Sequence, residues 1–313
     1  MIEYIGTDGA ENRKVIGAAL DLIEKAFGPE ERELERIQLC GEEAAENRDL
    51  LFTAWEDDAL LSTIHLTVSN AHPELACMGG LITSPAARGR GLADELFRQA
   101  VAAYDDMGGG TMFLGTNNDM AARFYARHGF QFMTGTNVMY RTNYDSLYKF
   151  YKGFFSGEKA ELRPFSAVYR IPIMPSFCAR GRDVLMDSNV SAVSSDILTQ
   201  FSCTGLYPRF LSLKEGGAAY GAELPTGALA AIGTGKDAPD GSRSVDGFAY
   251  PGYEAYIPQV VEAAAEGKTK LTALIAERDT EKAEQFVKMG FRPVKEEAFP
   301  VRGVLIPAIR YVK

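Results

Sequence analysis

Three apolar stretches that follow one another in the first half of the chain constrain its fold most strongly. They are Leu50–Trp55, Leu61–Val68 and Leu75–Thr83, joined by the polar turns Glu56-Asp57-Asp58 and Asn70-Ala71-His72-Pro73. Short apolar runs bounded by turn residues are typical of β-strands. Three consecutive strands joined in this way predict an antiparallel meander.

Strand and helix patterns alternate on both sides of this meander. Asn12–Phe27 carries apolar residues at helical spacing, and a further helix from Gly91 to about Met107 ends at the glycine run 108–110. The other expected elements are strands over Met1–Ile5 and Thr111–Leu114, a helix over Glu30–Leu39, a helix from the cap candidates Asn117, Asn118 and Asp119 through Arg127 to a left-handed Gly129, and a hairpin of Phe130–Met133 and Asn137–Arg141. The predicted fold class is α/β of the α+β kind, with a mixed, mostly antiparallel sheet flanked by helices.

The segment Arg88-Gly89-Arg90-Gly91-Leu92-Ala93 joins the last strand of the meander to the next helix. A loop that enters a helix points unpaired N–H groups at one place, and the helix dipole adds partial positive charge there. Gly89 and Gly91 let a ligand approach the backbone, and Ala93 keeps the first turn small. Arg88 and Arg90 add full positive charges. We therefore expect a diphosphate group to bind here, the alternative being a tight turn without a ligand.

Two better-known phosphate loops do not fit this segment. Asp94 stands where a dinucleotide-binding Gly-x-Gly-x-x-Gly needs its third small residue. The segment also lacks the Gly-Lys-Ser/Thr ending of a nucleoside-triphosphate loop.

The same segment resembles the Gln/Arg-x-x-Gly-x-Gly/Ala motif of the GNAT acetyltransferase superfamily. Residues 118–130, Asn-Asp-Met-Ala-Ala-Arg-Phe-Tyr-Ala-Arg-His-Gly-Phe, resemble the second block of that family, Asn-x-x-Ala-x-x-hydrophobic-Tyr-x-x-x-Gly-Phe. The order of the expected elements from Met1 to Arg141 also fits. The resemblance covers slightly under half of the chain, and it implies an N-acetyltransferase domain that uses acetyl-CoA as its co-substrate.

Carried over to this sequence, the resemblance implies a cofactor site. The backbone around Leu81 and Thr83 would pair with the pantetheine arm, because in the family the next strand splays away there. The thioester carbonyl would then point at a strand N–H that acts as an oxyanion donor. The residues implied to bind the cofactor are Leu81, Thr83, Arg88, Gly89, Arg90, Gly91, Leu92, Ala93, Asn118 and Tyr125.

The resemblance also implies that Tyr125 is the general acid. Asn118, Ala121 and Tyr125 share one helix face, which in the family looks at the CoA sulfur. A phenol with an ordinary pKa near 10 suits protonation of a departing thiolate. The alternative is an aromatic side chain that packs in the core.

The sequence does not assign the general base. Families of this type often place a glutamate on the strand before the loop, and here that strand offers only Glu74, near its start. His65 and Glu74 could each act through water, but each also fits a structural or solvated role. His128 lies at a helix end, where the dipole explains its charge without a catalytic role.

The length of 313 residues predicts two domains. We expect an acyltransferase domain over 1–143, an aromatic-rich connector over 144–163 and a second domain over 164–313, with apolar strands at Leu229–Ile232 and Leu271–Ile275. The connector is interpreted as a strap packed between the domains, the alternative being a partner-binding patch. Its aromatic residues include Tyr148, Phe150, Tyr151, Phe154 and Phe155.

The second half resembles a degenerate copy of the first. The interval from Arg88 to Gly129, counted back from Gly290, reaches Ala249, the first residue of Ala249-Tyr250-Pro251-Gly252-Tyr253-Glu254. By the same count, Asp279 and Phe286 stand in the places of Asn118 and Tyr125. The alternative is an unrelated fold with a chance match.

The matched positions of the second half argue against CoA binding in the usual way. Pro251 removes one N–H donor, and Glu254 puts a carboxylate at a loop meant for phosphates. Phe286 has no proton to give.

The composition argues against several classes of partner, location and cofactor. The formal net charge of −9 argues against a nucleic-acid partner. No basic and apolar leader opens the chain and no stretch has about 18 uninterrupted apolar residues, so we expect a cytoplasmic protein that is not in a membrane. The three histidines show no ligand spacing, so no metal is expected. The four cysteines, interpreted as reduced core thiols, are Cys40, Cys77, Cys178 and Cys203.

These observations favour transfer of an acetyl group from acetyl-CoA to a primary amine by direct attack. The acceptor, a small molecule or a peptide, is left unidentified, although an acidic protein mildly favours a cationic amine. Homo-oligomerisation is also left open. The alternative function is a non-catalytic acyl-CoA-binding or regulatory module whose second half binds a partner.

Overall fold

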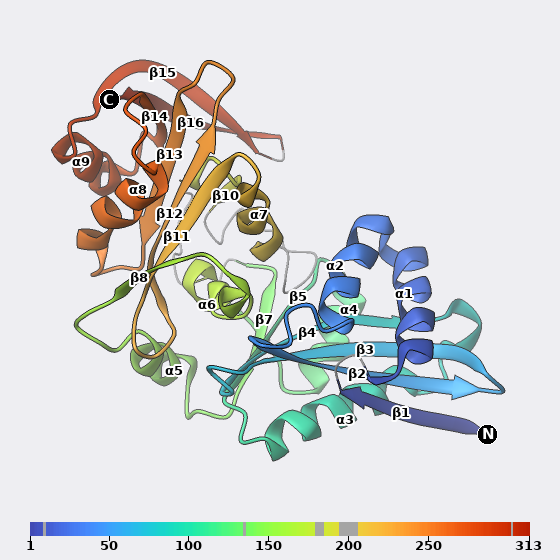
Figure 1. Ribbon diagram of the computed structural model, residues 1–313. Coiled ribbons are helices and arrows are strands. Elements are labelled where there is room, and N and C mark those ends of the chain that lie inside the picture. Colours follow the sequence, from blue (N-terminus) through green and yellow to red (C-terminus); the bar gives the residue numbers. More distant parts are fainter. Residues whose placement is uncertain (9–10, 134–135, 179–184, 194–205, 302) are drawn as a thin grey trace. The chain divides into compact units, whose positions relative to one another are not determined.

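The computed structural model describes residues 1–8, 11–133, 136–178, 185–193, 206–301 and 303–313. The chain forms two compact units. Among the described residues the first comprises 1–8, 11–132 and 138–150, and the second comprises 133, 136–137 and the described residues from Tyr151 onward. The two units are shown in Figure 1 and are described separately below. The domain boundaries expected from the sequence, 1–143, 144–163 and 164–313, stay a prediction.

The first unit is built on a seven-stranded sheet in the order β1-β2-β3-β4-β5-β7-β6. All neighbouring strands run antiparallel except β4 and β5, which run parallel. The expected meander is confirmed as β2 to β4. The strands are β1 (Ile2–Asp8), β2 (Asn47–Glu56), β3 (Ala59–Ser69), β4 (Leu75–Thr83), β5 (Thr111–Gly115), β6 (Gln131–Phe132) and β7 (Val138–Thr142).

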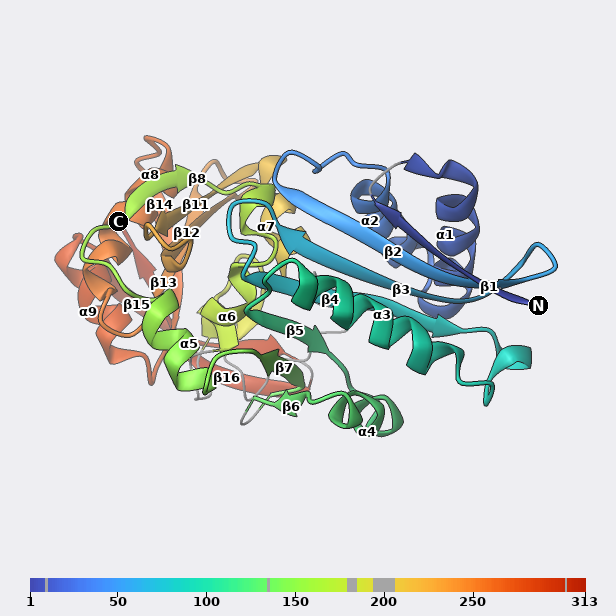
Figure 2. The same ribbon diagram turned by 90° about the horizontal axis from the view of Figure 1, so that it is seen from below.

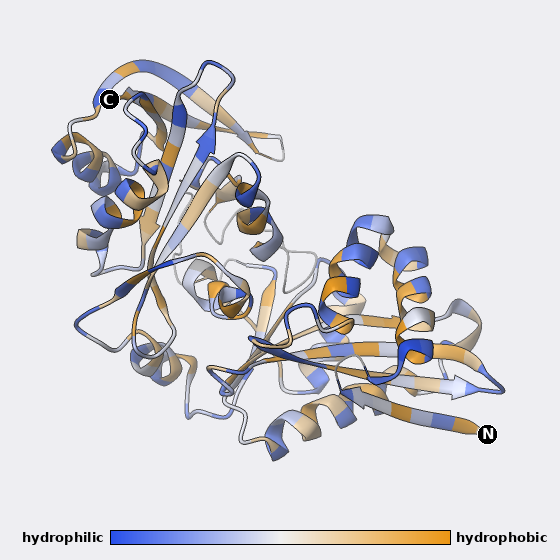
Figure 3. Cartoon of the chain, viewed as in Figure 1, coloured by the Kyte–Doolittle hydropathy of each residue, from blue (hydrophilic) through white to orange (hydrophobic). Residues whose placement is uncertain are grey.

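Helices cover both faces of this sheet. Helices α1 (Arg13–Phe27) and α2 (Pro29–Leu39) lie on one face, and α3 (Leu92–Asp106) lies on the other, as Figures 1 and 2 show. Figure 3 shows hydrophobic and hydrophilic bands alternating along α1 and α3, as in amphipathic helices. The Asn12 side chain caps α1 by accepting the N–H of Val15 at 3.2 Å.

Two details at helix ends differ from the sequence-based expectation. Phe27, expected on the inner face of α1, is 57% exposed because it is the last residue of that helix. Cys40, expected to be a core thiol, is exposed at the C-terminal cap of α2, whereas Cys77 and Cys178 are buried. Cys203 lies outside the described residues.

The second unit repeats the topology of the first. Its strand order, read from the β8 edge, is β8-β11-β12-β13-β14-β16-β15, and its one parallel pair is β13 with β14. A helix joins this parallel pair and another follows it, as α3 and α4 (Asp119–Arg127) do in the first unit. The elements are β8 (Glu161–Pro164), β11 (Gly217–Glu223), β12 (Leu229–Asp237), β13 (Arg243–Ala249), α8 (Ile257–Ala265), β14 (Leu271–Ala276), α9 (Thr280–Lys288), β15 (Arg292–Val301) and β16 (Val304–Val312).

Shorter elements complete the described part of the chain. Helix α5 (Leu147–Phe154) carries most of the connector aromatics, of which Phe150 is buried and Tyr148 is 73% exposed. The others are α6 (Ile173–Cys178), β9 (Leu185–Asp187), β10 (Ala192–Val193), α7 (Tyr207–Leu211) and the 3₁₀ turns Pro85–Ala87, Ala167–Tyr169, Ser212–Lys214 and Glu254–Tyr256. Among the described residues, no helix is long and apolar enough to cross a membrane.

A buried ionic cluster lies inside the second unit. Lys282 of α9 forms an ion pair with Asp246 of β13, and its ammonium also donates to the carbonyl of Met186 at 2.9 Å. Asp187 of β9 lies in the same cluster and is fully buried. Burial raises the pKa of Asp187 to about 7, and the nearby charge of Asp246 adds to the rise. The ammonium of Lys282 is thus the counter-charge that holds two carboxylates in the core.

Replacing Lys282 with methionine is therefore expected to destabilise the second unit by about 3–5 kcal/mol, because Asp246 is left buried without a counter-charge. Denaturant unfolding would measure the loss. The double variant Lys282→Met/Asp246→Asn should recover part of it, and Lys288→Met, an exposed lysine of the same helix, is the control. A loss no larger than that of the control would show that the pair contributes nothing.

Candidate functional site

Strands β4 and β5 separate after a short parallel contact. They pair only at Leu75 with Thr111, Ala76 with Met112, and Cys77 with Phe113. In the described part of the chain, no strand pairs with this edge of β4 beyond Cys77. The backbone from 78 to 83, which includes the predicted positions Leu81 and Thr83, therefore has an open edge that can accept an extended ligand.

A bulge lies within this open part of β4. Between the pairs His65 with Gly79 and Thr63 with Ile82, β4 carries one more residue than β3. Gly80 has a φ of +58°, a left-handed conformation that favours glycine. A bulge of this kind bends the strand and changes which way its groups point.

The predicted phosphate loop leads from β4 into α3. Gly91 is the N-cap of α3 with a φ of +76°, and it provides no side chain to cap the first N–H groups. Gly89 is also left-handed, with a φ of +77°. A Cβ on either glycine would meet no described atom within 4 Å, so open space lies in front of both. An uncapped helix N-terminus that faces open space is suited to bind an anion.

The two arginines of the loop have different partners. Arg90 forms a two-pronged ion pair with Glu56, with N–O distances of 2.7 and 2.9 Å. The Nε–H of Arg88 donates to the carbonyl oxygen of Thr83 at 3.3 Å. The charge of Arg90 is thus already matched by Glu56, and a bound diphosphate would compete with that carboxylate. Exposed ion pairs contribute little to stability, so this competition costs little.

Helix α4 presents the second predicted block. The Asn118 side chain caps the helix by accepting the N–H groups of Met120 and Ala121 at 2.9 and 3.3 Å. Tyr125 follows two turns later and is partly buried. Its ring centroid lies 5.5 Å from that of Phe97 in α3. Asn118 therefore has a structural role in starting the helix, and aromatic packing fixes the position of Tyr125.

A buried cluster of three ionisable residues lies on the α2 side of the same sheet. The imidazole of His65, on β3, contacts Glu35 Oε2 through Nδ1 at 2.6 Å and Asp49 Oδ1 through Nε2 at 2.9 Å. Thr67 also donates to Asp49 Oδ1, at 2.8 Å. His65, Glu35 and Asp49 are each at most 5% exposed.

The two carboxylates keep His65 protonated. Burial alone lowers the pKa of His65, but the charge of Glu35 and the hydrogen bonds to Asp49 and Glu35 outweigh it and raise the pKa to about 10. Both ring nitrogens then donate, one to each carboxylate. The cluster consists of one imidazolium between two carboxylates.

Glu35 connects this cluster to the open edge of β4. Its second carboxylate oxygen, Oε1, lies 3.8 Å from the position that a Cβ on Gly79 would take, and 3.7 Å from that of Gly80. Within the described residues, Oε1 has no hydrogen-bond partner. His65 was considered from the sequence as a candidate base, whereas Glu35 was not. A carboxylate at a buried position of α2, beside Gln38 and Leu39, was the available signal.

Glu74 does not join this group. It lies at the start of β4, five residues before Gly79, which is about 16 Å along an extended strand. Its carboxylate is 3.6 Å from the His72 ring. Burial raises the pKa of Glu74, but the contact with His72 outweighs this effect and the net pKa is lowered. Of the two residues considered from the sequence, the structure brings only His65 close to the open edge.

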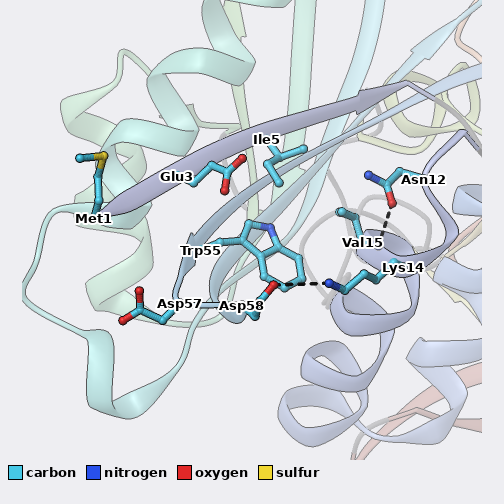
Figure 4. Close-up of a pocket in the computed structure, with 9 residues that line it drawn as sticks. All are labelled: Met1, Glu3, Ile5, Asn12, Lys14, Val15, Trp55, Asp57 and Asp58. Atoms are coloured by element: carbon cyan, nitrogen blue, oxygen red, sulfur yellow. Dashed lines mark hydrogen bonds and ion pairs between the residues drawn. The ribbon is translucent and has the colours of Figure 1, made fainter.

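A surface pocket in the first unit lies elsewhere. It has a volume of about 280 Å³ and is lined by Trp55, Lys14, Asp58 and other residues near the edge strand β1 (Figure 4). Lys14 lies 3.5 Å from Asp58, and the indole N–H of Trp55 already donates to Thr53. Strands β2 and β3 separate β1 from β4, so this pocket is not part of the site described above.

The loop of the second unit that matches the predicted phosphate loop is contacted by side chains of the chain itself. Both carboxylate oxygens of Glu254 accept the N–H of Gly252 at 3.0 Å, which confirms the expected carboxylate at this loop. The Tyr250 ring stacks on Phe155 with a centroid distance of 3.5 Å. The match by sequence spacing was wrong in one respect. Ala249 ends β13, whereas Arg88 lies beyond the end of β4, and α8 begins at Ile257, later than the spacing implied. The count back from Gly290 extends past the loop because α8, with 9 residues, is shorter than α3, with 15.

Charged and aromatic side chains are buried close to the β13–β14 contact. These strands pair in parallel only at Arg243 with Leu271 and Ser244 with Thr272. The ion pair of Lys282 with Asp246 lies in the core there, and Phe286 is fully buried. In the described residues, no cluster of histidine, cysteine, aspartate or glutamate in either unit has the arrangement of metal ligands.

The charge state of His65 gives a pH-dependent prediction. Its pKa is raised from 6.5 to about 10 on folding, so its stabilisation is complete below pH 6.5 and is lost as the pH rises through 10. His65→Gln is expected to lower the free energy of unfolding by about 3–5 kcal/mol at about pH 6, and by less at about pH 10. Urea unfolding of both proteins at both pH values would measure this difference. An equal loss at the two pH values would contradict a protonated ring.

Residues 17–130 match the family model described as "Acetyltransferase (GNAT) family". A search of curated proteins found no match.

Solved structures give further likenesses. An acyl-CoA N-acyltransferase from Pseudomonas aeruginosa is 24% identical, with 45% of this chain and 100% of that chain covered and a TM-score of 0.39. ElaA from Escherichia coli is 20% identical, with coverage of 45% and 99% and a TM-score of 0.37. A GCN5-related N-acetyltransferase from Kribbella flavida is 11% identical, with coverage of 99% and 71% and a TM-score of 0.42.

The matched segment contains the open edge of β4, the glycine loop and helix α4. Residues 17–130 therefore form a domain of the GNAT acetyltransferase family.

Proposed function

We propose that the first unit transfers an acetyl group from acetyl-CoA to a primary amine. The observation that carries this proposal is the open edge of β4, which is followed through the 3₁₀ turn Pro85–Ala87 and the glycine loop by the uncapped N-terminus of α3. A ligand with an extended amide-containing arm and a diphosphate matches both features at once. Acetyl-CoA is such a ligand, and it is the usual donor of the matched family.

In this arrangement the loop binds the diphosphate and the strand binds the arm. The N–H groups at the start of α3 and the side chain of Arg88 hold the phosphate oxygens. The backbone near Leu81 and Thr83 pairs with the pantetheine amides, as one strand pairs with another. The thioester then lies near the bulge at Gly80, where a strand N–H can stabilise the oxyanion.

Tyr125 is proposed to protonate the thiolate that leaves. Its position is fixed by packing against Phe97 and Phe124, which limits the motion of the ring. A positioned phenol can donate a proton to a thiolate without being ionised at neutral pH.

The second unit is proposed not to bind acetyl-CoA. Glu254 supplies an internal anion to Gly252 N–H, and the Lys282–Asp246 pair fills the core between β13 and β14. Bound CoA would have to displace buried charges that have partners. One acetyl-CoA per chain is therefore expected.

Gly91→Glu is expected to weaken acetyl-CoA binding at least tenfold, about 1.4 kcal/mol, because a carboxylate would face the diphosphate. Gly91→Gln is the matched control, since it imposes the same backbone strain at a φ of +76° without the charge. Calorimetry should give one site per chain for the wild type, with the glutamate variant weaker than the glutamine variant. Two sites, or equal affinities of the two variants, would contradict the assignment.

Release of CoA and mass-spectrometric detection of acetylated amine would test the activity. Tyr125→Phe is expected to lower kcat about 10²-fold with little change in the affinity for acetyl-CoA. Tyr148→Phe, which removes an exposed phenol, is the control. Binding of acetyl-CoA without transfer to any amine would favour the non-catalytic alternative, and full activity of Tyr125→Phe would leave Tyr125 a packing residue.

A further inference from the structure

We infer that Glu35 accepts the proton of a cationic amine substrate, and that His65 and Asp49 position its carboxylate for this task. The inference rests on the proposed function and adds to it a general base and a substrate class. It is carried by the place of Glu35 Oε1, which faces Gly79 and Gly80 on the open part of β4.

The contacts of Glu35 separate its two oxygens. Oε2 is 2.6 Å from the Nδ1 of His65, and this contact fixes the orientation of the carboxylate. Oε1 has no hydrogen-bond partner among the described residues, and it is not one of the enclosed side-chain atoms that lack a partner, so it can be reached from outside the protein. A substrate group can therefore supply a donor to Oε1.

The charge of the cluster selects a cation. The imidazolium of His65 balances one of the two carboxylates, so Asp49, His65 and Glu35 together carry a net charge of −1. In a buried place this charge is stabilised by a bound cation or by a proton. An aliphatic amine is a cation at neutral pH and can supply both, first as an ammonium and then as the donor of its proton.

The glycines of β4 leave room for this contact. Gly79 and Gly80 have no side chain between the carboxylate of Glu35 and the strand, and the left-handed φ of +58° disfavours other residues at position 80. A nitrogen bound to Oε1 would thus lie beside the strand segment at which the thioester is proposed to bind. The acceptor reaches the thioester from the α2 side of the sheet.

The proton balance of the transfer follows from this geometry. The ammonium gives one proton to Glu35, and the resulting neutral amine attacks the thioester carbon to form the C–N bond. Collapse of the tetrahedral intermediate breaks the C–S bond, and Tyr125 gives the thiolate its proton. The second proton of the nitrogen restores Tyr125, and Glu35 releases its proton to solvent with the products. The products are the N-acetyl amide, CoA as a thiol and one proton.

The test uses the full chain with a panel of primary amines at neutral pH. Benzylamine, 1,5-diaminopentane and lysine are protonated at their alkyl amines, whereas aniline and hydroxylamine are mostly neutral. The wild type is expected to prefer the cationic amines. Glu35→Gln is expected to lower kcat for them about 10²-fold or more. It should lower kcat much less for the neutral amines, which need no deprotonation before attack. The Kd for acetyl-CoA should not change.

Controls separate this role from a structural one. Glu33→Gln changes an exposed carboxylate on the same helix and should retain full activity. If Glu35→Gln does not fold, Glu35→Asp keeps the charge of the cluster and withdraws the carboxylate, and it should show the same selective loss for cationic amines.

Some outcomes would overturn the role of Glu35, and others would overturn the proposed function. A wild type that prefers neutral amines, or a Glu35 variant that loses equal activity with both kinds of amine, would overturn the role of Glu35. Full activity of Glu35→Gln with benzylamine would do the same. A wild type that binds no acetyl-CoA, or acetylates no amine in the panel, would instead overturn the proposed function.

Discussion

The separation of β4 from β5 is the feature on which the site depends. The two strands share only the pairs from Leu75–Thr111 to Cys77–Phe113, and β5 then continues beside β7. Backbone N–H and C=O groups need partners when they are buried, so a strand edge opened inside a sheet must be met by solvent or by a ligand. Because α3 starts at the end of the same strand, a single ligand can meet both the strand edge and the helix N-terminus. The bulge at Gly80 lies on the open part of β4. The carboxylate of Glu35 lies next to this bulge.

The second unit shows what happens to the same topology when that space is filled. Its parallel pair also separates after a short contact, but Lys282 and Asp246 form a buried ion pair there. At the loop, Glu254 meets the Gly252 N–H, and Tyr253 donates to the carbonyl oxygens of Phe155 and Gly157. The groups that a cofactor would satisfy are thus satisfied by the chain itself. The two units have the same strand order, but in the second unit side chains of the chain itself contact the loop groups. Both observations are consistent with a tandem arrangement in which the first unit has the open site.

Local patterns in the sequence were sufficient to predict most of the fold of the first unit. The meander, the cap of α4 and the left-handed Gly129 depend on neighbouring residues. The meander and Gly129 were predicted correctly, and the cap at Asn118 was one of three candidates. The errors and omissions depend on residues distant in sequence. Glu35 lies 30 positions from His65, and Arg90 lies 34 positions from Glu56, so only the packing of α2 and the hairpin between β2 and β3 reveals these partners. The slip at Ala249 arose because α8, with 9 residues, is shorter than α3, with 15, which changes the spacing without changing the topology.

The two buried charge clusters differ in a way that separates structure from function. In the cluster of the second unit, both carboxylate oxygens of Asp246 and both of Asp187 have partners. Asp246 accepts from Lys282, Gly247 N–H and Ser188, while Asp187 accepts from Thr234 and from the N–H groups of Asn189 and Val190. In the first unit His65 and Asp49 are satisfied in the same manner, but Glu35 Oε1 is not. A fully satisfied cluster contributes only to the fold, whereas one with an open acceptor can also bind a donor from outside the protein. Because Glu35 Oε1 faces the open part of β4, the same physical argument supports both proposals, a second unit closed to the cofactor and a first unit that binds an amine.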